Sequence, residues 1–343
     1  MRVRAPWIQA KLFAVMTSLL VVFSFATPYA ARALTNTYFV GSATSAGGGS
    51  CTNPDYSTQG SSAEQAINMA LEIVSNNDDV IVICDGTYRY TGNPGHFNMP
   101  FDFTIRAEHA GKVTLDGQGS FTLLFVNGGH LTVDGLRFIN AGDYGALAHP
   151  SGALTVISSE FVGNVQSSNG FGGGAISGEV WCYSQFVIID STFLRNAGPT
   201  GAVSTCSVSV SGSTFIGNTT SGWGGALYVC DLELTNSMFT GNTAMNGGAV
   251  SACEVSRMES TKFTSNAASL DGGAMSVGYA SSSDILRGNT FSGNRASGSG
   301  GAVMVCGTDQ RTIRTILTSN RFKGNRGRYG EVASKGRSCS RSN

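Results

Sequence analysis

The chain has 343 residues with 22 basic and 22 acidic side chains, and 41% of its residues are hydrophobic. These totals exclude a basic nucleic-acid-binding domain and a soluble acidic polymer. Glycine accounts for 46 residues, roughly twice its usual share, but it shows no triplet period, so a collagen-like chain is excluded as well.

The first 33 residues have the pattern of a secretory signal. Three basic residues precede an apolar run at residues 12–26, and small residues ending at Ala33 suit cleavage by signal peptidase. The apolar run has about 15 residues, whereas a membrane-spanning helix needs about 20. We therefore predict that residues 1–33 are a signal peptide. We expect the protein to be secreted or held at the cell surface, with no integral membrane span after the signal is removed.

A short helix is expected near the start of the mature chain. Ser62 and Gln65 form a capping-box pattern, and apolar residues at helical spacing continue from Ala63 to Val74. Residues 80–84 are typical of a buried strand that follows this helix. Because the end of a repeat structure exposes its core, we expect the helix to act as a cap.

Two short motifs alternate through the second half of the chain. A Phe-x-x-Asn tetrapeptide recurs at intervals of 22 to 32 residues, and a Gly-Gly-Ala type motif lies between successive copies. The phenylalanines of the tetrapeptide are Phe161, Phe193, Phe215, Phe239, Phe263, Phe291 and Phe322. Its asparagines are Asn164, Asn196, Asn218, Asn242, Asn266, Asn294 and Asn325.

The repeat predicts an all-β solenoid. Short stretches within each unit alternate between polar and apolar residues, which fits strands and not helices. Units of about 24 residues with several short strands fit the coils of a parallel β-helix. Leucine-rich repeats have a similar length but require a different ladder of Leu and Asn, which is absent from the sequence.

Stacked coils give each repeated residue a structural role. Equivalent residues lie about 4.8 Å apart in such a stack, so the phenylalanines are expected to form a buried column. The asparagines are expected to form a ladder at a bend, because an amide both donates and accepts hydrogen bonds. The Gly-Gly pair permits a bend with positive φ or a close approach of neighbouring backbone.

The two motifs together permit a comparison with a known family. Gly-Gly-Ala followed by Ile, Leu, Val or Met, alternating with Phe-x-x-Asn, resembles the repeats of chlamydial polymorphic outer-membrane proteins and, more broadly, secreted proteins with a pectin-lyase-like fold. The resemblance covers about half of the chain, from Phe161 to Asn325. It implies a right-handed parallel β-helix at a cell surface with an adhesin-like role.

We therefore expect one β-helix domain at residues 34–325. It divides into a cap with irregular coils at 34–150 and regular repeats at 151–325. A polar, basic tail follows at 326–343; from Arg311 onward the chain has nine Lys or Arg residues against one acid. Such a tail either holds an anionic glycan, lipid or nucleic acid or is a solvated, partly disordered terminus, and the second interpretation is favoured. The edge of the last coil invites self-association.

Eight cysteines in an exported chain favour disulfide bonds. We hypothesise a Cys51–Cys84 bond at the cap. Four further cysteines occupy equivalent repeat positions, so stacking brings neighbours near disulfide range, and a column of buried thiols is the alternative. We hypothesise one pair among Cys182, Cys206, Cys230 and Cys253.

No residue is assigned a catalytic, cofactor-binding or metal-binding role, and no cofactor is expected. A glycosidase needs two carboxyl groups about 5 to 9.5 Å apart, and the repeats do not align acids in that way. The strongest catalytic candidates also fit ordinary turns: Asp116, Gln118, Asp134, Arg137, Asp143 and Tyr144.

Other charged and ionisable residues are given ordinary roles. Glu233 and Arg257 hold equivalent positions in neighbouring units and are expected to form an exposed ion pair. The histidines are expected at the surface, and no zinc-binding spacing is present. They are His96, His109, His130 and His149.

The leading functional hypothesis is an exported, non-catalytic β-helix that acts in cell-surface adhesion or in cell-envelope and extracellular interactions. The alternative is a carbohydrate-active enzyme, either a polysaccharide lyase or a glycoside hydrolase of the pectin-lyase-like fold. Expected partners are extracellular glycans or surface molecules of a host or of the envelope, and no specific nucleic acid is expected. Self-association through the last coil is a further expectation.

Overall fold

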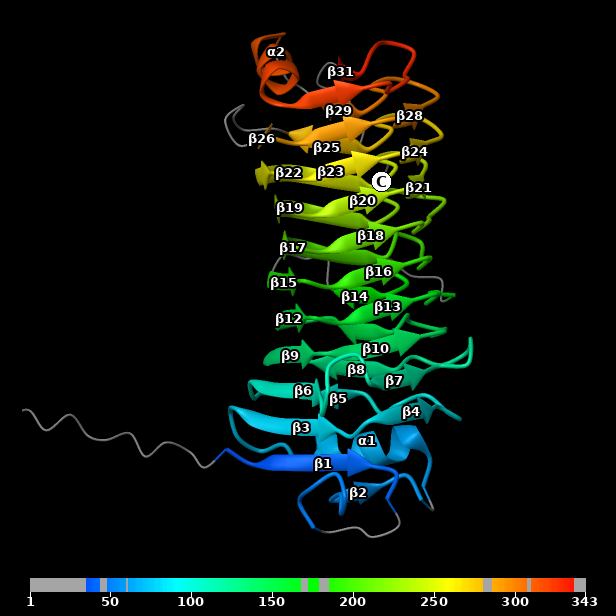
Figure 1. Cartoon of the computed structure of the whole chain (residues 1–343), viewed down its shortest axis with the longest axis vertical. Helices are drawn as coiled ribbons and strands as arrows, with labels where there is room; N and C mark the ends of the chain where they lie inside the picture. The colour runs from blue at the N-terminus through cyan, green and yellow to red at the C-terminus, as the bar shows by residue number, and fades with distance from the viewer. Residues whose placement is uncertain are drawn as a thin grey trace, which may run out of the picture. The chain divides into compact units, whose positions relative to one another are not determined.

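The computed structural model describes residues 35–43, 48–59, 61–167, 172–178, 185–279, 286–306 and 310–335. Residues 34–343 form one compact unit, and the proposed signal at 1–33 lies outside the described residues. The unit is a parallel β-helix, as the sequence predicts, and Figure 1 shows its strands stacked one above another. The strand ladders are parallel throughout the described part of the chain.

Three sheets form the walls of the β-helix. The largest contains β1 (Thr37–Gly41), β2 (Tyr56–Ser57), β3 (Asp79–Ile83), β5 (Phe97–Asn98), β6 (Phe103–Ala107), β8 (Leu124–Asn127), β9 (His130–Asp134), β11 (Leu147–His149), β12 (Ala153–Ile157), β14 (Ile176–Gly178), β15 (Gln185–Ile189), β17 (Val203–Ser211), β19 (Leu227–Thr235), β22 (Val250–Glu259), β25 (Met275–Tyr279), β26 (Leu286–Arg287), β29 (Val303–Cys306) and β31 (Val332–Lys335).

A second sheet carries the phenylalanine column, and a third is short. The second contains β4 (Gly86–Arg89), β7 (Val113–Asp116), β10 (Leu136–Ile139), β13 (Glu160–Val162), β16 (Thr192–Leu194), β18 (Thr214–Ile216), β20 (Met238–Thr240), β23 (Lys262–Thr264), β27 (Thr290–Ser292) and β30 (Arg321–Lys323). The third contains β21 (Thr243–Ala244), β24 (Ala267–Ala268) and β28 (Arg295–Ala296).

Helix α1 (Ala63–Glu72) caps the first coil. Ser62 and Gln65 form both bonds of the predicted capping box. Ile67 and Leu71 are buried in the core, and the helix contacts β1, β2 and β4. The predicted Cys51–Cys84 disulfide fastens this end of the chain, with 5.4 Å between the two Cα atoms.

The C-terminal end differs from the sequence expectation in two respects. Residues expected to continue the strands form helix α2 (Gln310–Ser319), which buries Ile313 and Ile316 and contacts β26, β30 and β31. The strand register also continues beyond the expected end of the β-helix at residue 325, because β31 pairs with β29. The sequence does not indicate this helix clearly, because most residues of α2 are polar or β-branched and few apolar residues mark its helical spacing.

The phenylalanines form one continuous stack inside the β-helix. Successive rings lie 4.6–5.0 Å apart between centroids and are nearly parallel, from Phe138 to Phe322. Phe138 is an additional first member, and Phe322 at the other end is only partly buried. Burying one such ring contributes on the order of 2 kcal/mol to stability.

The asparagines of the repeat are buried and hydrogen-bond in a fixed pattern. Asn218 illustrates it: its backbone N–H and its side-chain Nδ2 both donate to Oδ1 of Asn242, at 2.9 and 3.0 Å. The same Nδ2 also donates to the carbonyl oxygen of Phe193 at 3.0 Å. Each amide therefore satisfies its own polar atoms and those of the adjacent bend, where water is excluded.

The asparagine ladder has a terminator at each end. At the start, the ladder position is held by Ala141, whose backbone N–H donates to Oδ1 of Asn164 at 2.9 Å. At the finish, the backbone N–H and Nδ2 of Asn325 donate to Oε1 of Glu331 at 3.2 and 3.1 Å. Glu331 thus supplies the acceptor that a further asparagine would supply in another coil.

A second polar ladder runs two residues before each phenylalanine, and the sequence reasoning missed it. Its members are Ser159, Ser191, Ser213, Ser237, Thr261, Asn289 and Asn320. Each hydroxyl donates to a carbonyl two residues earlier and accepts the backbone N–H of the preceding member, for example Ser191 N–H to Ser213 Oγ at 3.1 Å. The last two members are asparagines, which bond side chain to side chain at 2.9 Å.

Two turn positions in the units from Phe161 to Phe291 use a left-handed backbone. The residues three before and two after the phenylalanine have φ between 46° and 67° there, as in Asp190, Asn236 and Gly241. This conformation favours Gly, Asn and Asp, which occupy most of these positions, although serine and Arg195 adopt it as well. In the Gly-Gly pair, Gly224 also has positive φ, and a Cβ on Gly225 would overlap the carbonyl oxygen of Gly248.

Replacing a central ladder residue should destabilise the fold strongly. In Asn242→Ala, the two donors of Asn218 and the carbonyl of Phe215 lose their buried partner. We expect a loss of about 3 kcal/mol in the free energy of unfolding, measured by chemical denaturation. Thr240→Ala, on the outward face of the same coil, is the matched control and should cost less than about 0.5 kcal/mol. Equal losses in both variants would contradict the ladder's energetic role.

Removing the terminal acceptor should loosen the last coils only. Glu331→Ala leaves two donors of Asn325 without an acceptor, whereas Glu331→Gln retains an oxygen in the same place. In the alanine variant we expect the free energy of local opening in residues 320–335 to fall by about 1 to 2 kcal/mol, which is measured as faster hydrogen exchange. Exchange in the glutamine variant should be near normal. Identical exchange in the two variants would show that Glu331 has no such function.

Candidate functional site

The strongest catalytic candidates lie at separate places on the coils. Asp116 ends β7 in the second sheet, Asp134 ends β9 in the largest sheet, and Asp143 lies in the loop after β10. Arg137 on β10 forms an ion pair with Glu160 on the next coil, at 2.9 Å between Nε and Oε2. The three acids therefore belong to different elements, and Arg137 is engaged by Glu160.

Hydrogen bonds account for the positions of these side chains. Oδ1 of Asp116 accepts from the backbone N–H of Gln118 at 3.0 Å and from Nδ2 of Asn140 at 3.1 Å. Gln118 has a φ of 52°, and its side chain donates to the carbonyl of Tyr90. Oδ2 of Asp143 accepts from Nδ2 of Asn93 at 3.3 Å. Asp116 braces the turn at Gln118, which is the structural interpretation that its Asp-Gly context favours.

The ion pair expected between Glu233 and Arg257 is not formed. The two residues are in register on β19 and β22, but a register shift lies at this point of the ladder. Arg257 instead binds Glu259 on its own strand, at 3.0 Å, and Glu259 also binds Arg287 on β26 at 2.8 Å. The hydrogen bond from Arg257 lowers the pKa of the Glu259 carboxyl below its ordinary value.

One group of metal-type ligands is exposed near the cap. Ligand atoms of Asp85, Glu108 and His109 lie within 4.8 Å of one another. Nδ1 of His109 is 3.0 Å from Oδ2 of Asp85, and Oε2 of Glu108 accepts the backbone N–H of Asp85 at 3.2 Å. These mutual contacts explain the cluster as a braced turn, and we assign no metal to it.

Four further cysteines among the described residues lie on strands of the largest sheet: Cys206, Cys230, Cys253 and Cys306. Sulfur atoms of Cys230 and Cys253 are 3.3 Å apart on adjacent strands. Cys206 and Cys306 take part in disulfides, and Cys182 lies outside the described residues. One pair among Cys182, Cys206, Cys230 and Cys253 stays a prediction.

His149 was expected at the surface, and this expectation is wrong. His149 is the last residue of β11, and its ring is completely buried. Nδ1 is 2.8 Å from the carbonyl oxygen of Val126, and the ring centroid is 6.0 Å from that of Phe186. Burial lowers the pKa of His149 to about 4, so the imidazole is neutral at neutral pH.

The outward surface carries an aromatic cluster that the sequence reasoning did not find. His96 is stacked on Phe125 with 3.8 Å between ring centroids. Tyr144, which is 43% exposed, lies edge-on to both rings. The three residues come from separate coils, so no local sequence signal joins them. An exposed group of rings of this kind is typical of a binding surface.

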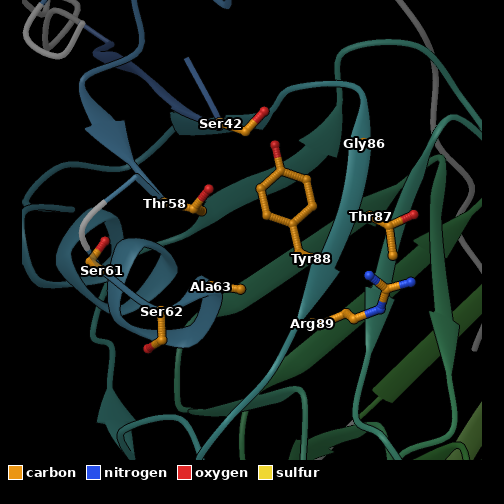
Figure 2. A pocket seen from close by; sticks show the side chains of 9 residues that line it. All are labelled: Ser42, Thr58, Ser61, Ser62, Ala63, Gly86, Thr87, Tyr88 and Arg89. Carbon is orange, nitrogen blue, oxygen red and sulfur yellow. The ribbon is translucent and has the colours of Figure 1, made fainter. Parts of the chain in front are cut away.

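Concave regions among the described residues include a pocket at the cap and an open groove near the C-terminal coils. The pocket, of about 240 Å³, lies between α1 and β4 (Figure 2) and is lined by Ser42, Thr58, Ser61, Ser62, Ala63, Gly86, Thr87, Tyr88 and Arg89. Tyr88 is central in this view, and its hydroxyl donates to the carbonyl of Cys84 at 2.8 Å. Ser61 and Ser62 are likewise hydrogen-bonded. The pocket is therefore a packing seam of the cap.

The open groove has a volume of about 470 Å³ and lies beside β24 and β28. Arg295 and Arg326 lie along it, and both are exposed. In contrast to the seam at the cap, its polar side chains are not used by the fold. Across the described part of the chain, no helix combines the length and the apolar character needed to cross a membrane.

Comparison with known proteins identifies the repeat. Residues 212–230 and 290–305 match the Chlamydia polymorphic membrane protein repeat. No curated protein matches the chain. The chain thus carries repeats of the type that its two motifs resemble.

Among solved structures, the chain is similar to the PL6 family alginate lyase AlyGC, at 14% sequence identity over 88% of this chain with a TM-score of 0.42. It is also similar to a mutant of that enzyme, at 12% identity over 87% of this chain with a TM-score of 0.41. The chain spans only 40% and 39% of the lengths of these two proteins.

The buried histidine should make stability depend on pH. The pKa of His149 falls from an ordinary 6.5 to about 4 in the folded chain, so the unfolded chain binds the extra proton between these values. The free energy of unfolding is therefore not reduced by His149 above pH 6.5, and protonation of the unfolded chain should lower it by about 3 kcal/mol as the pH approaches 4. His149→Phe keeps a ring but cannot titrate. Unfolding at pH 7 and pH 4.5 should show a smaller loss in this variant, and equal losses in both proteins would refute the assignment.

Proposed function

We propose that this protein is an exported, non-catalytic β-helix scaffold that binds partner molecules at a cell surface. The match to the Chlamydia polymorphic membrane protein repeat supports a surface location. The N-terminal signal pattern supports export. The finer role is adhesion or another interaction with the cell envelope or the extracellular surroundings.

One observation carries the proposal: the repeated residues are buried, and the outward residues differ from coil to coil. One outward register row contains Gln185, Ser207, Asp231 and Glu254. The rings and amides that repeat are packed inside at the same time. A rigid repeated core with a variable surface is the arrangement by which solenoid proteins present binding surfaces.

The positions of the acids support a binding role over catalysis. Asp116 and Asp143 are hydrogen-bonded within the fold, and Asp134 ends β9 in the largest sheet. A glycoside hydrolase requires two converging carboxyl groups, and a polysaccharide lyase requires a base placed beside its sugar. The exposed rings of His96 and Tyr144, which pack on the half-buried ring of Phe125, suit stacking on a partner instead.

The proposal predicts attachment without turnover. Beads coated with the folded protein should adhere to cultured epithelial cells, because adhesin-like proteins act on such surfaces. Beads coated with the heat-unfolded protein and beads coated with albumin serve as controls. The measurement is the number of beads that remain after washing at a fixed shear.

A turnover assay completes the experiment. The same preparation is incubated with pectin, alginate and other uronans, and new reducing ends and unsaturated products are measured. Neither should appear. Attachment no better than that of albumin beads would contradict adhesion, and turnover that depends on Asp116 or Asp134 would establish the enzyme alternative in its place.

A further inference from the structure

The residues that directly follow the ladder asparagines form a straight track along the outside of the β-helix. Parallel bridges and the strands β21, β24 and β28 connect them in order. The track consists of Val165, Ala197, Thr219, Thr243, Ala267, Arg295 and Arg326. Because neighbouring parallel strands are about 4.8 Å apart, the track presents one side chain at each such interval.

The ladder fixes the backbone of this track. Each track residue is covalently joined to an asparagine whose amide is bonded to the coils before and after it, such as Asn294 beside Arg295. The backbone N–H of Arg295 also donates to the carbonyl of Asn266, and that of Arg326 to Asn294. The side chains of the track are therefore attached to a rigid support, which reduces the entropy lost on binding.

The track ends in an open groove with two unpaired cations. Small residues, Ala268, Ala296 and Gly327, leave the space of about 470 Å³ beside the two arginines. Arg295 and Arg326 are in register on adjacent coils, so two like charges are held about one strand spacing apart. Neither forms an ion pair within the described residues.

The surrounding coils do not neutralise this charge. Residues 262–335, which include every coil that lines the groove, contain ten Lys or Arg residues against four acids. One of the acids, Glu331, uses Oε1 to accept two hydrogen bonds from Asn325. Exposed Lys323 and Arg328 lie on the same coil as Arg326 and add to the positive potential. Such a potential attracts a polyanion and raises its local concentration.

We propose that this groove binds a linear, acidic glycan that runs along the β-helix axis. Carboxylate or sulfate groups on successive sugars accept paired hydrogen bonds from the guanidinium groups of Arg295 and Arg326, the geometry in which arginine binds such anions best. The inference rests on the proposed surface-binding function and specifies the chemistry of its ligand.

Two further features favour a glycan over a nucleic acid. The hydroxyl groups of Thr219 and Thr243 lie on the same track, 2.9 Å apart, and can donate to and accept from sugar hydroxyls. The track residues include no aromatic side chain, whereas single-stranded nucleic acids bind by stacking their bases on aromatic rings. The track thus matches a polymer of polar, charged sugar units.

The test uses the full-length protein and a defined sulfated octasaccharide prepared from heparin. Affinity is measured by isothermal titration calorimetry at low and moderate ionic strength. A neutral octasaccharide and a single-stranded oligonucleotide of equal charge are the comparison ligands. We expect the sulfated glycan to bind, to weaken with added salt and to exceed both comparison ligands. Equal or tighter binding of the oligonucleotide would overturn the glycan assignment.

Paired variants locate the site. Arg295→Gln with Arg326→Gln should lower the affinity for the sulfated glycan by at least about tenfold, because two charge-assisted contacts are lost. Lys112→Gln with Arg195→Gln removes the same charge from exposed positions on other coils and should change affinity by less than about twofold. Circular dichroism and thermal unfolding verify that both variants fold. Equal losses in the two variants, or no loss in the first, would overturn the groove as the site.

The bead assay separates this inference from the function on which it rests. If the protein attaches to cells but does not bind the sulfated glycan, the groove inference fails and the adhesive function stands. If the protein binds the glycan through the two arginines but does not attach to cells, the adhesive function fails and the groove inference stands. Attachment lost in the arginine variant and kept in its control supports both.

Discussion

The structure depends on satisfying polar backbone groups at bends from which water is excluded. A coil of about two dozen residues must turn several times, and each turn leaves N–H and C=O groups that no strand pairs. Asn164 and its equivalents supply the missing partners by bonding to one another along the axis and to a phenylalanine carbonyl of the preceding coil. The serine and threonine ladder does the same at a second bend. Both ladders require strict register, since a slip of one residue would break every rung.

The strict register of the buried residues also fixes the spacing of the side chains on the outer surface. Side chains that point outward are placed at fixed intervals along the axis, whatever their chemistry, because the buried residues set the spacing. The positions after the asparagines can therefore change from valine to threonine to arginine without a change in the fold. The opposite holds for Asp116 at the end of β7, whose Oδ1 already braces a turn. Binding chemistry is thus available where the fold makes no demand on the side chain.

Much of the architecture could be predicted from the sequence because its causes repeat. The column of Phe161 and its equivalents, the Gly-Gly bends and the N-terminal cap with its disulfide all follow from residue types at regular positions. The second polar ladder was missed because serine, threonine and asparagine alternate in it, so no single letter recurs. Helix α2 was missed because its only buried apolar residues in the described part, Ile313 and Ile316, lie within a polar segment at a position where other coils have a strand.

The candidate site was predicted less well because its residues meet only through stacking. His96, Phe125 and Tyr144 are far apart in the chain and become neighbours when their coils are superposed. His149 is buried, but its register partner on the next coil is the half-buried Gly178, so the neighbouring unit does not indicate burial. The arginine pair could be found only once the track after the asparagines was known.

Glu331 takes the place of a further asparagine as the last acceptor of the ladder, and this arrangement allows such chains to vary in length. Ala141 and Glu331 terminate the series from outside, and every rung between them has the same donors and acceptors on both sides. Duplication or loss of one whole unit would join identical surfaces and leave both terminators in place. Evolution can therefore lengthen or shorten this molecule in steps of one coil, moving the basic groove nearer to or farther from the cap without redesigning either.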